Sequence, residues 1–288
     1  MSSGLPSIER EPLRCLRLPT GVELHHVQAG VGGPLIFVHG VMGDWASWGP
    51  QWAAFTPHFR CLSYSRRYNH PNRNDMPSPD HSALVEAQDL IGLMDALAMQ
   101  RATLVASSYG AFVALALAVA QPARVRALVA VEPAMMGYAQ FSDRGQAEWA
   151  RFRTQVVEPA NAAFRQGDDE GGALLMTGGI HHAGSAATQG SQLQRRLQNA
   201  RAMRMLALSS DEFPLLPPAA LAALPMPVLL VTGELTPPVH AEVFRNVCAA
   251  MPQAAVARIA GAGHAVPRDQ PEAFNTLALD FLASSLDA

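Results

Sequence analysis

The feature that most constrains the fold is an alternation of short apolar runs with helical patterns after residue 33. Apolar runs bounded by turn residues recur at 34–38, 59–64, 102–106, 125–131, 228–232 and 255–259. Each run is short enough for a buried strand. Helical patterns lie between most of them, most clearly at 82–99, where apolar residues are spaced three or four apart. The alternation predicts an α/β protein with a doubly wound, mostly parallel sheet.

Two segments depart from this alternation. Extended runs at 13–18 and 22–27 flank the turn signal Pro19-Thr20-Gly21, which predicts an opening hairpin. From about 134 to 217 there are helical patterns and glycine pairs without a strand pattern. We therefore expect a core made of residues 1–134 and 216–288, and an inserted helical cap made of residues 135–215.

Composition and charge exclude several classes of protein. Hydrophobic residues make up 49% of the 288-residue chain and charged residues 16%, which favours a packed core over disorder. A formal charge of −3 provides no basic field for nucleic acid, so a small neutral or weakly charged molecule is the expected partner. Charged residues at 9–11 and the lack of a membrane-length apolar run predict a cytoplasmic protein without a membrane partner. Homo-oligomer formation is left open.

Cysteines and paired histidines give no sign of a metal or cofactor. Cys15, Cys61 and Cys248 are far apart and odd in number, so we expect buried thiols. The neighbours His25-His26 and His181-His182 should point apart, which prevents chelation of one metal ion. The loop Arg66-Arg67-Tyr68-Asn69-His70, after the fourth strand, could bind a carboxylate, but a charge pair in a loop is usually solvated, and the loop is left without an assigned role.

The strongest chemical signal is the stretch LVASSYGA at 104–111, followed by a helix-like run at 112–120. A strand, a turn and a helix meet at Ser108, as in a nucleophile elbow. Such a strained turn needs small residues two positions before and after the serine, and Ala106 and Gly110 meet that need. The alternative is an ordinary serine in a strand-to-helix loop.

Two further loops match the needs of an acyl-transfer site. The stretch IFVHGVMGD at 36–44 places a glycine-containing turn after the third strand, so the backbone N–H groups of Val41 and Tyr109 are the expected oxyanion donors. His39 is expected to brace this loop by hydrogen bonding. The stretch IAGAGHAVP at 259–267 places His264 in a glycine-rich loop from which its imidazole can reach Ser108.

With these stretches and the Thr232-Gly233-Glu234 strand end, the chain from residue 33 onward resembles the α/β-hydrolase superfamily. The resemblance implies a Ser–acid–His triad in that chain order, with Ser108 as nucleophile and His264 as general base. The superfamily includes esterases, lactonases, C–C hydrolases, dehalogenases, epoxide hydrolases and non-enzymatic receptors. Dehalogenases and epoxide hydrolases of this fold use an Asp nucleophile, so Ser108 argues against both.

The chain departs from the superfamily at the triad acid. The usual acid position falls in GELTP at 233–237, where Thr236 cannot be a carboxylate. The alternatives are Glu132 at the end of the strand after the nucleophile helix, Glu234, or no acid. We favour Glu132, because catalytic groups gather at the carboxyl ends of parallel strands. Thr236 should then occupy the usual position without touching a titrating group.

The predicted function is a serine hydrolase that acts on a small hydrophobic ester or lactone through an acyl-serine intermediate. Hydrolytic C–C cleavage by the same triad is one alternative. A ligand-binding signalling protein with slow turnover is another, and the missing acid at 236 is its main support. We interpret most of the apolar cap residues as core of the insertion and expect about one in three to face the pocket. These residues are Met135, Met136, Phe141, Trp149, Phe152, Met203, Met205 and Leu206.

Overall fold

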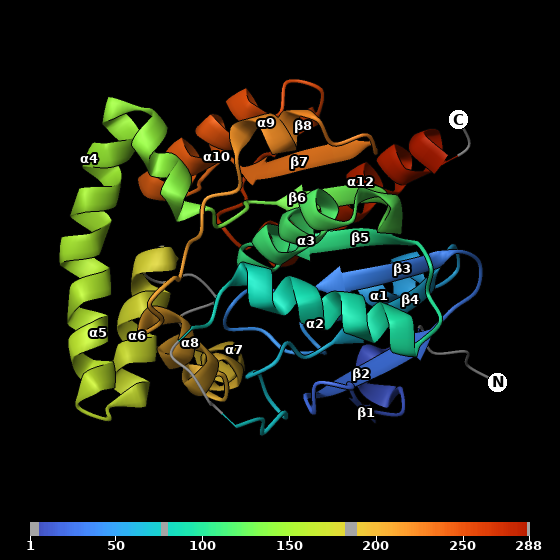
Figure 1. Ribbon diagram of the computed structural model, residues 1–288, viewed down its shortest axis with the longest axis horizontal. Helices are drawn as coiled ribbons and strands as arrows, with labels where there is room; N and C mark the ends of the chain where they lie inside the picture. The colour runs from blue at the N-terminus through green and yellow to red at the C-terminus, as the bar shows by residue number, and fades with distance from the viewer. Residues whose placement is uncertain (1–5, 76–79, 182–188, 287–288) are drawn as a thin grey trace.

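The computed structural model describes residues 6–75, 80–181 and 189–286. Its strands form one eight-stranded sheet in the order β1-β2-β4-β3-β5-β6-β7-β8 (Figure 1). The strands are β1 Arg14–Arg17, β2 Glu23–Ala29, β3 Pro34–Val38, β4 Arg60–Tyr64, β5 Ala102–Ser107, β6 Val125–Val131, β7 Val228–Gly233 and β8 Ala255–Ile259. β2 pairs antiparallel with β1 and β4, and all other pairs are parallel. The predicted hairpin and mostly parallel sheet are confirmed.

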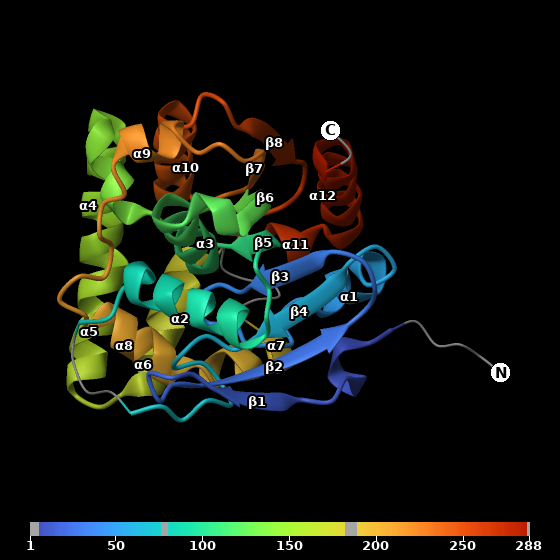
Figure 2. The same ribbon diagram turned by 45° about the vertical axis from the view of Figure 1, so that its right-hand side comes forward.

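Helices cover both faces of the sheet (Figure 2). One face carries α1 Gly49–Phe55, α11 Val266–Asp269 and α12 Pro271–Leu286, and the other carries α2 Ala83–Ala96, α3 Tyr109–Ala120, α9 Pro218–Ala222 and α10 Pro238–Ala250. Strand side chains alternate between the two layers: Leu35 and Phe37 pack on the α1 side, while Ile36 and Val38 pack on the α2 side. Burial on both faces explains why these strands read as continuous apolar runs.

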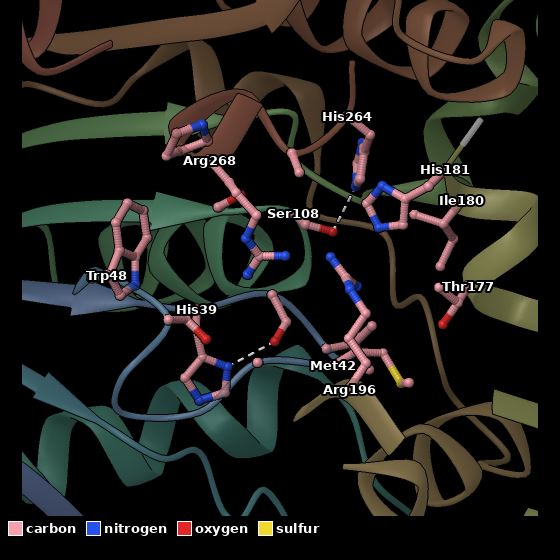
Figure 3. Close-up of a pocket in the computed structure, with 17 residues that line it drawn as sticks. His39, Met42, Trp48, Ser108, Thr177, Ile180, His181, Arg196, His264 and Arg268 are labelled. Carbon is pink, nitrogen blue, oxygen red and sulfur yellow. Dashed lines mark hydrogen bonds between the residues drawn. The ribbon is translucent and has the colours of Figure 1, made fainter. Parts of the chain in front are cut away.

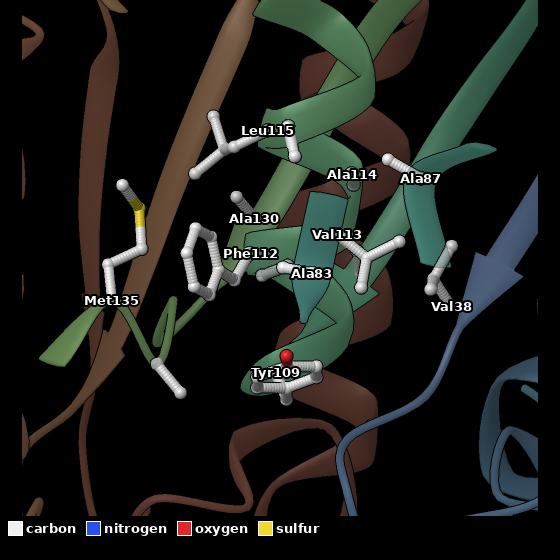
Figure 4. Close-up of a cluster of buried hydrophobic side chains, with 14 of the residues drawn as sticks. Val38, Ala83, Ala87, Tyr109, Phe112, Val113, Ala114, Leu115, Ala130 and Met135 are labelled. Atoms are coloured by element: carbon white, nitrogen blue, oxygen red, sulfur yellow. The ribbon is translucent and has the colours of Figure 1, made fainter. Parts of the chain in front are cut away.

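Helix α3 lies in the middle of the larger apolar layer. Its residues from Tyr109 to Ala118 are all buried, as expected of a helix that is apolar on every side. Figure 4 shows Phe112 and Val113 of α3 gathered with Ala83 of α2 and Ala130 of β6. This packing fixes the beginning of α3, and with it the position of the preceding Ser108.

The chain between β6 and β7 forms a helical insertion. It contains η3 Met136–Phe141, α4 Asp143–Phe152, a π-helical turn Arg153–Val157, α5 Glu158–Arg165, α6 Asp169–Ile180, α7 Gly190–Leu197 and α8 Ala200–Ala207. No strand occurs in the described part of this segment. The insertion lies beyond the carboxyl ends of the parallel strands (Figure 1). Of the described helices, none is long and apolar enough to cross a bilayer. Two short 3₁₀ turns, η1 Ile8–Arg10 and η2 Pro122–Arg124, complete the described elements.

Candidate active site

Ser108 occupies a strained turn between β5 and α3. Its φ of 55° and ψ of −124° lie outside the regions that non-glycine residues prefer. The turn is held from both sides, because the Ser108 N–H donates to Val131 O (2.8 Å) and the N–H of Ala111 donates to Ser108 O (3.0 Å). A Cβ on Gly110 would overlap the carbonyl oxygens of Val38 and His39. The small residue expected after the serine is therefore required by the neighbouring strand end.

His264 reaches Ser108 from the loop between β8 and α11. Its Nε2 lies 3.0 Å from Ser108 Oγ, within hydrogen-bond distance (Figure 3). The loop runs against the end of β7, where a Cβ on Gly233 would overlap the carbonyl oxygens of Ala262 and Gly263. This close approach brings the loop over the carboxyl end of the sheet, with the imidazole buried.

Glu132 supplies a carboxylate on the opposite side of the imidazole. Its Oε2 lies 3.0 Å from His264 Nδ1, and its side chain is fully buried. The other oxygen, Oε1, accepts hydrogen bonds from Thr232 Oγ1, the Gly233 N–H (3.0 Å) and Thr236 Oγ1 (2.6 Å). These contacts use the acceptor sites of both oxygens. The carboxylate is thus fixed in one orientation toward Nδ1.

The contacts of Thr236 correct one expectation and support another. We expected Thr236 to touch no titrating group, yet it donates to Glu132. The physical reason is that β6 and β7 are adjacent parallel strands, so the loops at their carboxyl ends meet. Glu234 is exposed and accepts from the Gly261 N–H at 3.0 Å, and no hydrogen bond between it and His264 is found in the described residues. Of the two candidate carboxylates, the structure places only Glu132 at the imidazole.

The loop after β3 is braced by His39 and by residues of the β4–α2 loop. His39 Nδ1 lies 2.7 Å from Gly40 O, and His39 Nε2 accepts from the Arg66 N–H at 3.1 Å. Burial, followed by the positive charge of Arg66, lowers the pKa of His39 to about 3, so the ring is neutral and can accept at Nε2. Asn69 Nδ2 donates to Val41 O (2.7 Å) and Gly43 O (2.9 Å). The predicted bracing role of His39 is confirmed.

The two expected oxyanion donors line a pocket together with Ser108. Among the described residues, no backbone carbonyl accepts from the N–H of Val41. Tyr109 is the first residue of α3, where an N–H has no partner inside its own helix. Gly40 packs so closely that a Cβ there would lie 3.2 Å from Ser108 Cβ. Both residues therefore line the pocket beside Ser108, where their N–H groups remain the predicted oxyanion donors.

The Arg66-Arg67 pair is not solvated, contrary to expectation. Arg66 is 2% exposed and forms an ion pair with Glu86, which is 3% exposed and is also within 2.8 Å of His81 Nε2. Burial raises the pKa of Glu86, but the charges of Arg66 and His81 outweigh it and lower the pKa to about 2. Arg67 pairs with the buried Asp89 at 2.7 Å. Sequence reasoning missed these residues because their partners lie about twenty positions away on α2.

The pocket above Ser108 has two lobes that share Val41, Ser108 and Ile180. One lobe, of about 690 Å³ with its solvent-open mouth, is lined by His39, Trp48, His181, Arg196, His264 and Arg268, among others (Figure 3). The other, of about 430 Å³, is mainly apolar. Five of the eight apolar insertion residues singled out above line it, namely Met136, Trp149, Phe152, Met203 and Leu206. This is more than the expected one in three, because the inner face of the insertion is also the pocket wall.

The other histidines and the cysteines singled out in the sequence lie outside the triad or only line the pocket beside it. His181 lines the pocket, whereas His182 lies outside the described residues. Cys61 is buried, but Cys15 is exposed on the edge strand, contrary to expectation; Cys248 is partly buried. Within the described ranges, no cluster of His, Cys, Asp and Glu side chains could hold a metal ion.

Comparison with known proteins places this geometry among hydrolases. Residues 35–277 match the model of a family described as the alpha/beta hydrolase family. A relative from Caulobacter sp. (strain K31), named as a carbamate hydrolase, is 25% identical over 272 residues, or 91% of this chain and 94% of the relative. A 2-hydroxy-6-oxononadienedioate/2-hydroxy-6-oxononatrienedioate hydrolase from Paraburkholderia xenovorans (strain LB400) is 27% identical over 310 residues, or 98% and 100% of the two chains. The solved structure of a hydrolase from Pseudomonas aeruginosa superposes with a TM-score of 0.75 at 22% identity, over 94% of this chain and 98% of that one.

Proposed function

The chain is a hydrolase that belongs to the alpha/beta hydrolase family, and we propose that it uses Ser108 to cleave a small ester or lactone through an acyl-serine intermediate. The observation that carries the proposal is the continuous path Ser108 Oγ, His264 Nε2, His264 Nδ1, Glu132 Oε2, with 3.0 Å at each hydrogen bond. Nucleophile, base and orienting anion are in contact, which is the arrangement that acyl transfer requires.

In the first half-reaction, Ser108 Oγ attacks the substrate carbonyl carbon while His264 Nε2 takes the hydroxyl proton. The carbonyl oxygen becomes an oxyanion, for which the N–H groups of Val41 and Tyr109 are the donors. The positive end of α3 adds to that stabilisation. When the tetrahedral intermediate collapses, the bond to the alcohol oxygen breaks and His264 gives its proton to the leaving alcohol.

In the second half-reaction, water replaces the alcohol. His264 takes a proton from water, the resulting hydroxide attacks the acyl carbonyl, and the proton returns to Ser108 Oγ as the acid leaves. Glu132 keeps Nδ1 protonated and stabilises the imidazolium in both halves. Its own fixed orientation, with three donors on Oε1, means that no reorganisation is needed when charge develops.

Hydrolytic C–C cleavage is the second candidate, because the oxo group in the name of the Paraburkholderia relative is a ketone and not an ester. The same serine, base and oxyanion donors serve attack on an activated ketone. The slow-turnover signalling alternative loses its main support, because a carboxylate is present at Nδ1 even though position 236 is Thr.

Pre-steady-state hydrolysis of p-nitrophenyl butanoate tests the proposal. We expect a burst of p-nitrophenol close to one equivalent per chain if deacylation is slower than acylation, and an acyl adduct on the intact protein after rapid acid quenching. Hydrolysis at the rate of buffer alone, with no adduct at any quench time, would reject the serine hydrolase.

A further inference from the structure

Two arginines that have no carboxylate in contact among the described residues face the pocket from opposite walls. Arg196 belongs to α7 of the insertion, and Arg268 belongs to α11, four residues after His264. Both line the same lobe as Ser108 and His264. Figure 3 shows both guanidinium groups extending into the pocket near Ser108. The lobe therefore brings two cations to the reacting centre.

Asp269 attracts both guanidinium groups and Asp44 attracts that of Arg268, but no described carboxylate is in direct contact with either arginine. No hydrogen bond or ion pair to either side chain is found in the described residues, and Arg196 Nε and Arg268 Nη1 are fully buried without a partner. The stretch 182–188, which precedes α7, contains no Asp or Glu in its sequence. The acids nearest to Arg268 are engaged elsewhere: Asp269 accepts from the Gly263 N–H (2.9 Å), and Asp44 pairs with Arg195 (3.2 Å).

The pKa values of the two arginines are lowered because both side chains are buried without an anion in contact. Burial, followed by repulsion from Arg268, lowers the pKa of Arg196 to about 9. Burial also lowers the pKa of Arg268. An arginine guanidinium stays protonated at neutral pH, and a desolvated cation without an anion in contact is unfavourable. An anion that enters the lobe removes this penalty.

The second lobe has the opposite character. Its apolar walls are Met136, Trp149, Phe152, Met203, Leu206 and Phe213. Glu212 and His240 also line it, but burial raises the pKa of Glu212 to about 8, so this acid is uncharged at neutral pH. Because the lobes join at Ser108, a substrate whose carbonyl carbon lies at Oγ has one arm in a cationic environment and the other in an apolar one. The pocket selects for a molecule with two unlike ends.

We propose that Arg196 and Arg268 form a carboxylate subsite, so that the natural substrate carries a carboxylate on one side of the scissile bond and an apolar group on the other. Arginine forks match the two oxygens of a carboxylate, and charge-assisted hydrogen bonds are the stronger kind. This inference rests on the proposed serine hydrolase function and narrows its substrate class from neutral esters to acidic ones.

Three esters test the subsite and show which arm carries the charge. The neutral reference is p-nitrophenyl pentanoate; mono-p-nitrophenyl glutarate places a carboxylate on the acyl arm, and 3-carboxy-4-nitrophenyl pentanoate places it on the leaving group. We expect one of the two acidic esters to exceed the neutral ester in kcat/KM by about 10- to 100-fold. Arg196→Met and Arg268→Met should each reduce that preference, measured as the ratio of kcat/KM for the acidic ester to kcat/KM for pentanoate, about tenfold or more.

Arg204→Met is the matched control. Arg204 lies on α8 of the same insertion and pairs at 3.3 Å with Asp169, both half-exposed, so this variant removes the same charge away from the pocket. It should leave the preference unchanged. Arg268→Lys, which keeps the charge at a site where Met could disturb α11, should retain part of the preference.

Glutarate binding separates failure of the subsite from failure of the hydrolase. Calorimetric titration of glutarate into Ser108→Ala protein needs no turnover, and we expect binding that weakens about tenfold or more when Arg196→Met is added. Binding without hydrolysis of any ester would overturn the proposed function and keep the subsite. Hydrolysis with pentanoate preferred over both acidic esters, or glutarate affinity unchanged by the arginine variants, would overturn the subsite.

Discussion

The floor and the roof of the pocket differ in how their polar groups are satisfied. The floor comprises Ser108, His264, Glu132 and the loop 39–43 after β3, and its carboxylate, imidazole and loop carbonyls are hydrogen-bonded. The roof is the inner face of the insertion, where Thr177 Oγ1 and Arg196 Nε are buried without a partner. Polar groups that are hydrogen-bonded are held in one geometry, whereas we interpret the buried polar groups without a partner as contacts for a ligand. The floor should therefore set the rate for every substrate, and the roof, together with Arg268 of α11, should set the choice among them.

Removing the nucleophile should have the largest effect. We expect Ser108→Ala to lower kcat for p-nitrophenyl butanoate by about four to six orders of magnitude, because the covalent route is lost. His264→Ala should do comparable harm, and the double variant should cost little more, since the two residues act as one unit. Near-wild-type thermal unfolding is the control. Activity of Ser108→Ala above about one hundredth of wild type would show that Ser108 is not the nucleophile.

Glu132→Gln should lower turnover by about a hundredfold to ten-thousandfold, because His264 loses the anion that fixes its tautomer and stabilises its charge. Steady-state kinetics on a folded variant measure this.

Thr236→Asp is the paired variant and should not raise activity. Its carboxylate would abut Glu132 Oε1, which Thr236 now contacts at 2.6 Å, and two carboxylates at that distance repel. A mild effect of Glu132→Gln together with a gain in activity from Thr236→Asp would show that Glu132 is not the triad acid.

The buried charge pair beneath the floor should govern stability. Arg66→Met removes the arginine partner of buried Glu86 and leaves only His81 in contact with it, so we expect the free energy of unfolding at pH 7 to fall by about 3–5 kcal/mol in urea titrations. Arg204→Met, which removes a half-exposed pair in the roof, should cost at most about 1 kcal/mol. Equal losses in the two variants would contradict the difference between floor and roof.

The same substitution has a definite pH dependence. In the wild type, the pKa of Glu86 is lowered to about 2, so its contribution to stability is full above its ordinary pKa of 4.5 and is lost as the pH falls toward 2. In Arg66→Met, burial raises the pKa of Glu86 against the remaining contact with His81 only, so this pKa is higher than in the wild type and protonation at low pH relieves the buried charge. The stability difference between the two proteins should therefore shrink from pH 7 to pH 3, and a constant difference would show that Glu86 is not its source.

The smallest effect is expected in the apolar lobe. Trp149→Ala removes part of the lobe wall and should change the ratio of kcat/KM between butanoate and octanoate esters by about tenfold, with little change in acylation chemistry. Phe141→Ala is the control, because Phe141 is 49% exposed on the same insertion and does not line the lobe. An unchanged ratio would mean that the insertion does not select the acyl chain.

How much of the molecule could be predicted from the sequence depended on how local the signal was. Strands buried on both faces are continuous apolar runs, and the elbow at Ser108 is a steric requirement confined to Ala106, Ser108 and Gly110, so both could be predicted. The interpretation of His264 was local in the same way, since a glycine-rich loop surrounds it.

Features that depend on distant partners could not be predicted in the same way. The contact between Thr236 and Glu132 joins residues 104 positions apart, and Arg66 meets Glu86 across the loop before α2. The unpaired state of Arg196 and Arg268 is visible only once the insertion is placed over the sheet. Charge pairing is a property of the folded arrangement and leaves no periodic pattern in the chain.

Active-site labelling tests the central claim, that Ser108 is the nucleophile, most directly. The protein is treated with a fluorophosphonate, digested, and the modified peptide identified by mass spectrometry, with Ser108→Ala protein treated in parallel. The account predicts one phosphonyl adduct, on Ser108, that forms with loss of esterase activity and does not form in Ser108→Ala. Full loss of activity with the adduct on another residue, or an unlabelled Ser108 in an inactivated enzyme, would contradict it.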